Sequence, residues 1–237
     1  MKIIYTLITI TFFLSACSSM SNAQQNQLTK EEKQEGWKLL FDGNSIDHWR
    51  GYQKESVPTA WKVKDGNLTL IPGKDGGDLI SRKKYEDFVL KLDWKVEKGG
   101  NSGVFYKAME QPTQAIYWSA PEIQVLDNKN HPDANKGENG NRKSGSLYDL
   151  IPAKPQNANP YGEWNSLKLV VKGPHIQHWQ NGEMVVEYKM WDNEWYEMIR
   201  NSKFQNHPEY GDAREGYIGL QDHGDQVSFR NIKIKEL

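Results

Sequence analysis

The feature that most constrains the fold is a series of short segments in which apolar and polar residues alternate. Every second residue from Phe88 to Val96 is apolar. Because side chains of a β-strand point alternately to its two faces, this pattern predicts a strand with one buried face. Further strands are predicted at residues 61–63, 67–71, 103–107, 122–127, 165–171, 175–179, 183–188, 217–221 and 227–235.

Tight turns and scarce helix indicate how these strands are connected. The dipeptides at 65–66 (DG) and 181–182 (NG) lie between predicted strands and are strong hairpin signals. Helix is predicted only at 29–32 (TKEE), a capping box, and at 192–204, where Asp192 would cap a short amphipathic helix. We therefore expect an all-β fold: an antiparallel two-sheet β-sandwich of the jelly-roll kind with one short inserted helix.

The beginning of the chain predicts a leader rather than part of the fold. An uncharged run follows Lys2, and it is shorter than the roughly 20 residues that span a membrane as a helix. The run ends in residues 14–17 (LSAC), which resemble a bacterial lipobox, and Cys17 is the only cysteine. We therefore expect Cys17 to carry a lipid that anchors the protein in the bacterial cell envelope, on a membrane face that these residues leave open. The expected organisation is a signal peptide at 1–17, a flexible tether at 18–28 and a single domain at 29–237.

Charge, motifs and aromatic content indicate which kinds of ligand the protein binds. The formal net charge of -1 provides no basic field for nucleic acid. No glycine-rich dinucleotide fingerprint opens a βαβ unit, so we expect no nucleotide cofactor. Nine tryptophans and eleven tyrosines are more aromatic surface than the core of so polar a chain needs, which favours a carbohydrate-binding cleft.

The segment 121–127 (PEIQVLD) combines a carboxylate and an amide in an otherwise apolar strand. Alternation places Glu122, Gln124 and Leu126 on one face. Burying a carboxylate is costly unless it is paired or used, so Glu122 is a candidate for chemistry. The alternative is a structural role, on a solvated sheet face or in an ion pair.

A second candidate segment ends a predicted strand just before a glycine turn. Gln221, Asp222 and His223 follow one another there, and an imidazole exchanges protons near neutral pH. The alternative is that Asp222 and His223 only form hydrogen bonds within the turn.

Several segments together resemble the 3-keto-disaccharide hydrolase domains, a family similar in fold to concanavalin A-like lectins and glucanases. The order and spacing of the segments carry the resemblance, and they cover almost the whole chain beyond the leader. They are residues 36–43 (GWKLLFDG), 100–105 (GNSGVF), 121–128 (PEIQVLDN), 162–165 (GEWN), 178–182 (HWQNG), 216–224 (GYIGLQDHG) and 229–232 (FRNI). The chain departs from the pattern at Lys107, where relatives often carry arginine.

The resemblance implies cleavage of sugars that are already oxidised at C3. The ketone acidifies the C2 proton, a base removes it, the aglycone leaves from C1, and water adds to the resulting enone. Such a site needs a base, an acid and a donor or cation for the enolate oxygen. We expect Glu122 as base and His223 as acid, or the reverse, with Asp222 beside them, and a separate sugar 3-dehydrogenase as the source of the ketone.

The remaining site predictions concern binding. Amides are expected to hold sugar oxygens at Gln124, Asn101 and Gln221, and rings to stack on the sugar at Trp118, Tyr148 and Trp179. The alternative for Trp179 is a place in the core, and for Tyr148 it is to brace a loop. Further substrate contacts are expected at Lys107, Asp127 and His131. Glu122, Asp127, Asp222, His223 and His131 could supply donors to a divalent metal, but they show no recognised ligand spacing, so a metal is left open.

Two other functions compete with this interpretation. A retaining glycosidase needs a second carboxylate about 5 to 5.5 Å from the first, whereas Asp127 on a regular strand would lie roughly 16 Å from Glu122. Only a bulge would bring the two together. A sugar-binding module without catalysis would explain the aromatic residues but leave Glu122 and His223 without a role.

Overall fold

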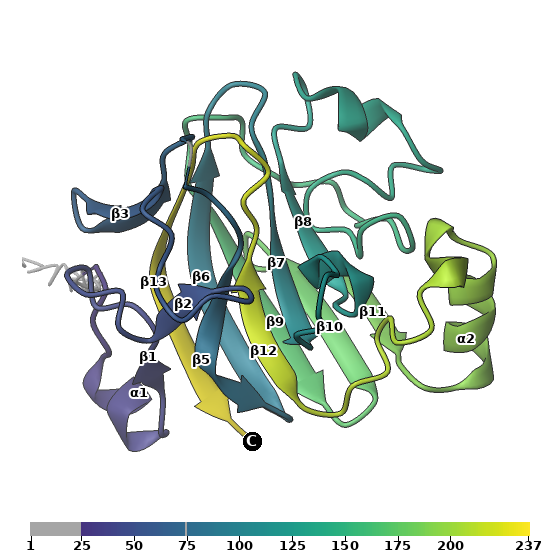
Figure 1. Ribbon diagram of the computed structural model, residues 1–237, viewed down its shortest axis with the longest axis horizontal. Helices are drawn as coiled ribbons and strands as arrows, with labels where there is room; N and C mark the ends of the chain where they lie inside the picture. Colours follow the sequence, from purple (N-terminus) through teal and green to yellow (C-terminus); the bar gives the residue numbers. More distant parts are fainter. Residues whose placement is uncertain (1–24, 74) are drawn as a thin grey trace, which may run out of the picture.

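The computed structural model describes residues 25–73 and 75–237, and these residues form two antiparallel sheets packed face to face (Figure 1). The strands are β1 (Lys38–Leu39), β2 (Trp49–Gly51), β3 (Trp61–Lys64), β4 (Asn67–Leu70), β5 (Leu79–Tyr85), β6 (Phe88–Val96), β7 (Asn101–Ala108), β8 (Glu122–Leu126), β9 (Asn165–Lys172), β10 (His175–Gln180), β11 (Glu183–Lys189), β12 (Gly216–Leu220) and β13 (Val227–Glu236). The helical segments are α1 (Lys30–Gln34), η1 (Ile116–Trp118), η2 (Pro132–Asn135), α2 (Asn193–Arg200) and η3 (Lys203–Asn206).

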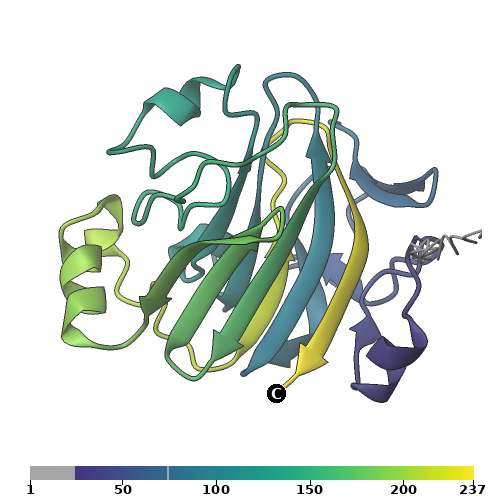
Figure 2. The same ribbon diagram turned by 180° about the vertical axis from the view of Figure 1, so that it is seen from behind.

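The larger sheet has eight strands in the order β11-β10-β9-β6-β13-β4-β3, with β1 beside β13. Figure 2, the view from behind, shows the outer face of this sheet, which is turned away from the other sheet. The smaller sheet has five strands in the order β2-β5-β12-β7-β8, so β8 is an edge strand. The predicted all-β sandwich is therefore confirmed.

The core lies between the two sheets and follows the alternation in the sequence. In β6 the apolar positions from Phe88 to Val96 are all buried, as predicted. Ile123 and Val125 of β8 join the same core, as do Val104 and Tyr106 of β7. The other side chains of β7 and β8 therefore point to the outer face of the smaller sheet, where the site described below lies.

The interior strand β5 of the smaller sheet is the main element that the sequence pattern did not predict. It pairs with both β2 and β12, yet its second half carries Arg82, Lys83 and Lys84. These charged residues hide the alternation. The short strands β1 and β2 were missed as well.

Both predicted helices are present. The Thr29 hydroxyl accepts a hydrogen bond from the Glu32 N–H in the expected capping box of α1. Asp192 caps α2 by accepting from the Trp195 N–H at 2.9 Å, and Trp195 and Ile199 are buried. A single helix was predicted over 192–204, but the structure has two helical segments there. Helix α2 ends at Arg200, and the last residues of the predicted segment belong to η3.

The N-terminal prediction is wrong in one respect, because part of the expected tether is packed against the domain. The N–H groups of Asn26 and Asn231 each donate to the other residue's Oδ1 at 2.7 Å, and Asn26 is buried. This exchange occurs where β13 bulges away from its register with β6. The folded region therefore begins before Thr29. Cys17, the predicted signal peptide and residues 18–24 lie outside the described residues, and within the described part of the chain no helix is long and apolar enough to cross a membrane.

Two connections flank the β8 edge of the smaller sheet. The long segment between β8 and β9 and the α2–η3 segment lie on the same side of the molecule in both views (Figures 1 and 2). Together with the outer face of β7 and β8, they supply the walls of the candidate site.

Candidate active site

A pocket of about 200 Å³ lies on the outer face of the smaller sheet, at β7, β8 and the end of β12. It contains six of the twelve side chains that the sequence predicted for catalysis and substrate binding. The lining residues are Asn101, Tyr117, Glu122, Gln124, Tyr148, Lys203, Phe204, Gln221 and His223.

Glu122 is the buried carboxyl group of this pocket. It is only 5% exposed, and its side chain lies across Gly103 on the neighbouring strand β7. A Cβ atom at Gly103 would collide with the carboxyl oxygen, so glycine is needed there to make room. No described residue donates a hydrogen bond to this carboxyl.

The surroundings of Glu122 favour its protonated form. Burial raises its pKa to about 8, the nearby cation of Lys203 opposes that shift, and the charges of Asp78 and Asp133 add to it. The carboxyl therefore holds its proton at neutral pH and is suited to donate it.

Lys203 is a pocket residue that sequence reasoning missed. It lies at the start of η3, and its Nζ is 4.0 Å from the centroid of the Tyr148 ring. Burial lowers the pKa of Lys203. No local motif marked this lysine, because only the packing of α2 and η3 against the sheet edge brings it into the pocket.

Two amide oxygens in the pocket are buried without a partner. Neither Asn101 Oδ1 nor Gln221 Oε1 receives a hydrogen bond from a described residue. Leaving a buried acceptor unpaired costs about 1 to 3 kcal/mol, so a ligand that supplies hydroxyl groups would be favoured there. Gln124 is partly engaged, because its Nε2 donates to the Arg142 carbonyl at 3.3 Å.

The aromatic side of the pocket differs from the prediction. Tyr148 lines it as expected, and its hydroxyl donates to Asp133 Oδ2 at 2.9 Å. Trp118, by contrast, is not a lining residue and stacks on His207 with ring centroids 3.8 Å apart. Its neighbour Tyr117, which is 48% exposed, is the ring that faces the pocket.

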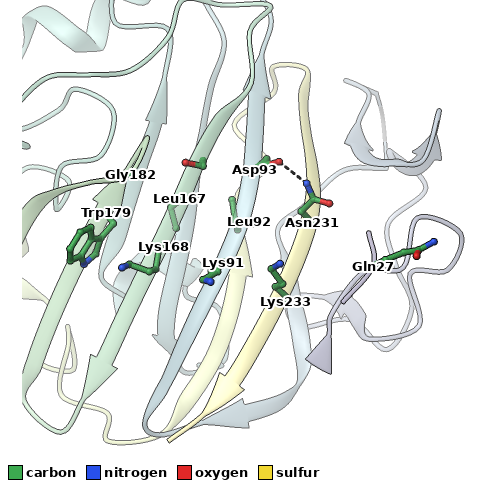
Figure 3. Close-up of a pocket in the computed structure, with 11 residues that line it drawn as sticks. Gln27, Lys91, Leu92, Asp93, Leu167, Lys168, Trp179, Gly182, Asn231 and Lys233 are labelled. Carbon is green, nitrogen blue, oxygen red and sulfur yellow. Dashed lines mark hydrogen bonds between the residues drawn. The ribbon is translucent and has the colours of Figure 1, made fainter. Parts of the chain in front are cut away.

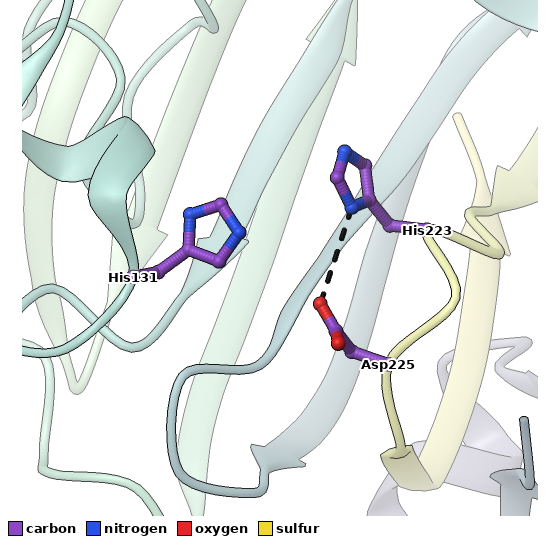
Figure 4. Close-up of side chains that lie close together, drawn as sticks. All are labelled: His131, His223 and Asp225. Carbon is purple, nitrogen blue, oxygen red and sulfur yellow. Dashed lines mark ion pairs between the residues drawn. The ribbon is translucent and has the colours of Figure 1, made fainter.

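His223 stands at the mouth of the pocket beside a carboxylate and a second histidine (Figure 4). Its Nδ1 lies 4.0 Å from Asp225 Oδ2, and its ring is nearly perpendicular to that of His131, with centroids 6.0 Å apart. The Asn101 N–H donates to Asp225 Oδ2 at 3.1 Å and so holds that carboxylate in place. The sequence predicted both histidines but not Asp225.

These three side chains are the described residues that could hold a metal ion. Their donor atoms all lie within 4.8 Å of one another, but a zinc-type ion holds its ligands at about 2.0 to 2.2 Å. In addition, His131 Nδ1 accepts a hydrogen bond from the Asp133 N–H at 3.1 Å, whereas a metal-bound imidazole donates from its second nitrogen. The arrangement therefore fits a pair of imidazoles beside a carboxylate better than a metal centre.

Two carboxylates that the sequence placed in the site have structural roles instead. Asp222 accepts from the Gly77 N–H at 2.7 Å and from the Gly224 N–H at 2.9 Å, so it braces the turn. Asp127 accepts from the Gly99 N–H at 2.8 Å and from the backbone and side chain of Asn130. Neither residue lines the pocket, and N–H donors engage their oxygens.

Two further predicted contacts lie away from the pocket. Lys107 is fully buried and donates to the carbonyls of Glu86 and Arg214, so its ammonium serves the fold. Trp179 belongs to β10 of the larger sheet and lines a different hollow, described below. Neither residue can contact a sugar bound beside Glu122.

The pocket lacks the carboxylate pair of ordinary glycosidases. Glu122 is the only acidic residue among the described residues that line it, and Asp127 is held in a turn beyond the end of β8. A retaining enzyme needs two carboxyl groups about 5 to 5.5 Å apart. The arrangement instead offers one protonated carboxyl, one imidazole and one ammonium group.

Comparison with known proteins agrees with this geometry. The family model of the 3-keto-alpha-glucoside-1,2-lyase-like domain matches residues 36–235. A 3-keto-disaccharide hydrolase of Bacteroides thetaiotaomicron is 43% identical over 250 residues, which cover 94% of this chain and 86% of that protein.

Solved structures give the same assignment. A Parabacteroides distasonis protein described as a glycosyl hydrolase is 34% identical, with a TM-score of 0.82, over 90% of this chain and 100% of its own. A Bacillus subtilis protein with a galectin-like fold has a TM-score of 0.54 over 90% of this chain and 95% of its own, but at 14% identity it shows the fold alone. The chain is a glycosyl hydrolase and belongs to the family of 3-keto-alpha-glucoside-1,2-lyase-like domains.

Proposed function

We propose that this protein cleaves glycosides whose sugar is already oxidised to a ketone at C3. The observation that carries the proposal is the composition of the pocket, in which Glu122 is the only lining acid of the described residues and holds its proton at neutral pH. One acid, one imidazole and one cation suit an elimination better than a displacement by two carboxylates. The name of the Bacteroides relative supports the same substrate class.

The reaction proceeds in two stages that balance as a hydrolysis. A base takes the C2 proton, the C–H electrons form an enolate with the C3 oxygen, and the C1–O bond breaks as the leaving oxygen receives a proton. Water then adds to C1 of the enone, and C2 regains a proton. The products are the free aglycone and a 3-keto sugar, and no oxidant is consumed.

The pKa of Glu122 favours one distribution of roles. Because burial raises this pKa to about 8, Glu122 is proposed as the acid that protonates the leaving oxygen. His223, partly exposed at the pocket mouth, is then proposed as the base at C2. This is the reverse of the first assignment made from the sequence.

Other pocket residues are proposed to bind and stabilise. The Lys203 ammonium would stabilise the enolate oxygen, since a fixed cation in a partly buried site lowers the cost of that developing charge. The unpaired oxygens of Asn101 and Gln221 would accept hydrogen bonds from sugar hydroxyl groups.

The test compares a 3-keto disaccharide with its unoxidised parent as substrates of the same protein. We expect release of product from the keto form only, together with exchange of the C2 hydrogen for deuterium in heavy water. Cleavage of the parent disaccharide at a similar rate would contradict the proposal. A parallel assay with a chelator tests whether an ion at His131, His223 and Asp225 contributes.

We also propose that the protein is lipid-anchored in the cell envelope through Cys17, as the lipobox-like segment predicts. Metabolic labelling with a lipid analogue should mark the wild type and leave Cys17→Ser unlabelled. Since the chain itself has no dinucleotide fingerprint, the ketone would be supplied by a separate oxidising enzyme.

A further inference from the structure

A second hollow, of about 330 Å³, lies on the outer face of the larger sheet (Figure 3). It is separate from the catalytic pocket, which lies on the smaller sheet. Lys91, Lys168, Lys233 and Trp179 are among its lining residues, and we call it the lysine groove. Gln27 lines it on one side and Gly182 of the β10–β11 turn on the other.

The strand register places like charges directly opposite one another in this groove. Lys91 of β6 is the register partner of Lys168 on β9 and of Lys233 on β13, so three lysines form a row across neighbouring strands. Trp179 of β10 continues the row beside Lys168. Like charges at opposed positions destabilise a sheet, so such a row requires an explanation.

Only one of the three lysines forms an ion pair among the described residues, because Lys233 is paired with Glu32. Lys91 lies near enough to Glu32 and Glu35 for its charge to lower their pKa values, but it pairs with neither, and Lys168 has no ion pair in the same part of the chain. Asp93 is the only acid that lines the groove in the described part of the chain, and it already accepts from Arg230 Nε at 3.1 Å and Asn231 Nδ2 at 2.7 Å. Its charge is therefore not available to the lysine pair.

Indole rings hold the two unpaired ammonium groups in place. Lys168 Nζ lies 3.5 Å from the centroid of the Trp179 ring, and Lys91 Nζ lies 4.5 Å from that of Trp37. Such contacts orient a cation without cancelling its charge. Burial lowers the pKa of Lys168, and the charge of Lys91 lowers it further, so a bound anion would relieve both effects.

We propose that the lysine groove binds an acidic carbohydrate, with the carboxylate or sulfate group of a uronic or sulfated sugar held between Lys91 and Lys168 and the ring placed beside Trp179. Ammonium groups recognise such anions, and indoles pack against the apolar faces of sugars. A recessed groove receives a group that enters it, whereas a flat anionic membrane needs cations that protrude. The acidic glycan would thus be held on the larger sheet, whereas the catalytic pocket lies on the smaller sheet.

The experiment is a calorimetric titration of the full chain with a galacturonate tetrasaccharide and with its methyl-esterified counterpart, which has the same sugars without the charges. The free acid is expected to bind, more weakly as salt rises, and the ester is not. Binding should weaken about tenfold in Lys91→Gln/Lys168→Gln. Turnover in the catalytic pocket should stay at the wild-type level.

A matched double variant, Lys172→Gln/Lys189→Gln, removes the same charge from exposed residues of β9 and β11 that do not line the groove. It should bind the free acid as the wild type does. Circular dichroism and thermal unfolding establish that both double variants are folded. The proposal is overturned if the ester binds as well as the free acid, if the control variant loses as much affinity, or if the tetrasaccharide does not bind at all. It is also overturned if the only ligand whose binding depends on Lys91 and Lys168 is a vesicle that contains phosphatidylglycerol.

Discussion

The two ends of the segment around β8 carry carboxylates that are both nearly inaccessible to solvent and behave in opposite ways. Glu122 at the start is 5% exposed, and Asp127 just beyond the end is 3% exposed. Burial raises the pKa of Glu122 to about 8. Burial also acts to raise that of Asp127, but hydrogen bonds from Gly99 and Asn130 lower the pKa of Asp127 below its ordinary value.

The difference shows that the depth and the donors around a carboxylate, and not its exposed area alone, decide what it does. Asp127 is surrounded by N–H groups that satisfy its charge, so it fixes the turn and has no free lone pairs for chemistry. Glu122 lies over Gly103 with no described donor, so it keeps a proton that it can deliver. The following changes would break or sharpen this contrast.

The largest effect is expected from Glu122→Gln. Removing the proton donor should lower turnover of a 3-keto disaccharide by about 10³-fold, because a positioned acid commonly contributes 10² to 10⁴. Steady-state kinetics on the purified variant measures this loss. Asp127→Asn is the matched control and should retain most of the wild-type rate if folded; equal losses in both variants would erase the contrast.

The second effect concerns the dependence of stability on pH. The folded-state pKa of Glu122, about 8, exceeds its ordinary value of 4.5, so unfolding releases its proton between these pH values. The free energy of unfolding should therefore fall as pH rises from 5 towards 8, on the order of 3 kcal/mol relative to Glu122→Gln. Urea denaturation at several pH values measures the difference, and parallel curves for the two proteins would contradict the raised pKa.

A smaller effect is expected on stability from Asp127→Asn. The amide cannot accept from all of the donors that now surround the carboxylate, so buried N–H groups lose their partner, at a cost of about 2 kcal/mol. The contribution of Asp127 should also vanish in acid, since a lowered pKa means that its stabilisation is lost as pH falls through the folded-state value. Denaturation at neutral and acidic pH tests both points; a variant as stable as the wild type at neutral pH would show that the turn does not need the charge.

The smallest effect is expected from Tyr148→Phe. This change removes the hydroxyl that donates to Asp133 and keeps the ring beneath Lys203. Stability should fall by about 1 kcal/mol, with little change in KM, because the hydroxyl already donates to Asp133. A large rise in KM without loss of stability would instead indicate that the hydroxyl contacts the sugar.

The fold was predictable wherever burial follows a simple period. The alternation of Phe88 to Val96 gave β6 with its bounds, and the turn at 181–182 gave the β10–β11 hairpin. Strand β5 was not predictable, because its second half carries Arg82, Lys83 and Lys84 and because it bulges out of register with β12 between Ile80 and Lys84. The pattern records where side chains point and not which backbones pair.

The site was predictable in part, and for a similar reason. Glu122 and Gln124 share one face of one strand, so local alternation sufficed to place them together. Lys203 comes from η3, which is far from β8 in the sequence, and no sequence motif marked it as a pocket residue. Asp222 resembled a catalytic residue because sequence records the carboxylate but not the two N–H groups that its oxygens accept from.

The reciprocal hydrogen bonds between Asn26 and Asn231 have a mechanical consequence. Strand β13 is paired with β6 on one side and β4 on the other, so it is an interior strand of its sheet. Asn26 also reaches the β3–β4 turn, because its Nδ2 donates to the Gly66 carbonyl at 2.7 Å, so the start of the described chain is tied to two parts of the larger sheet. A pull on residue 26 would therefore be shared between an interior strand and a hairpin turn, whereas an edge strand would give way one hydrogen bond at a time.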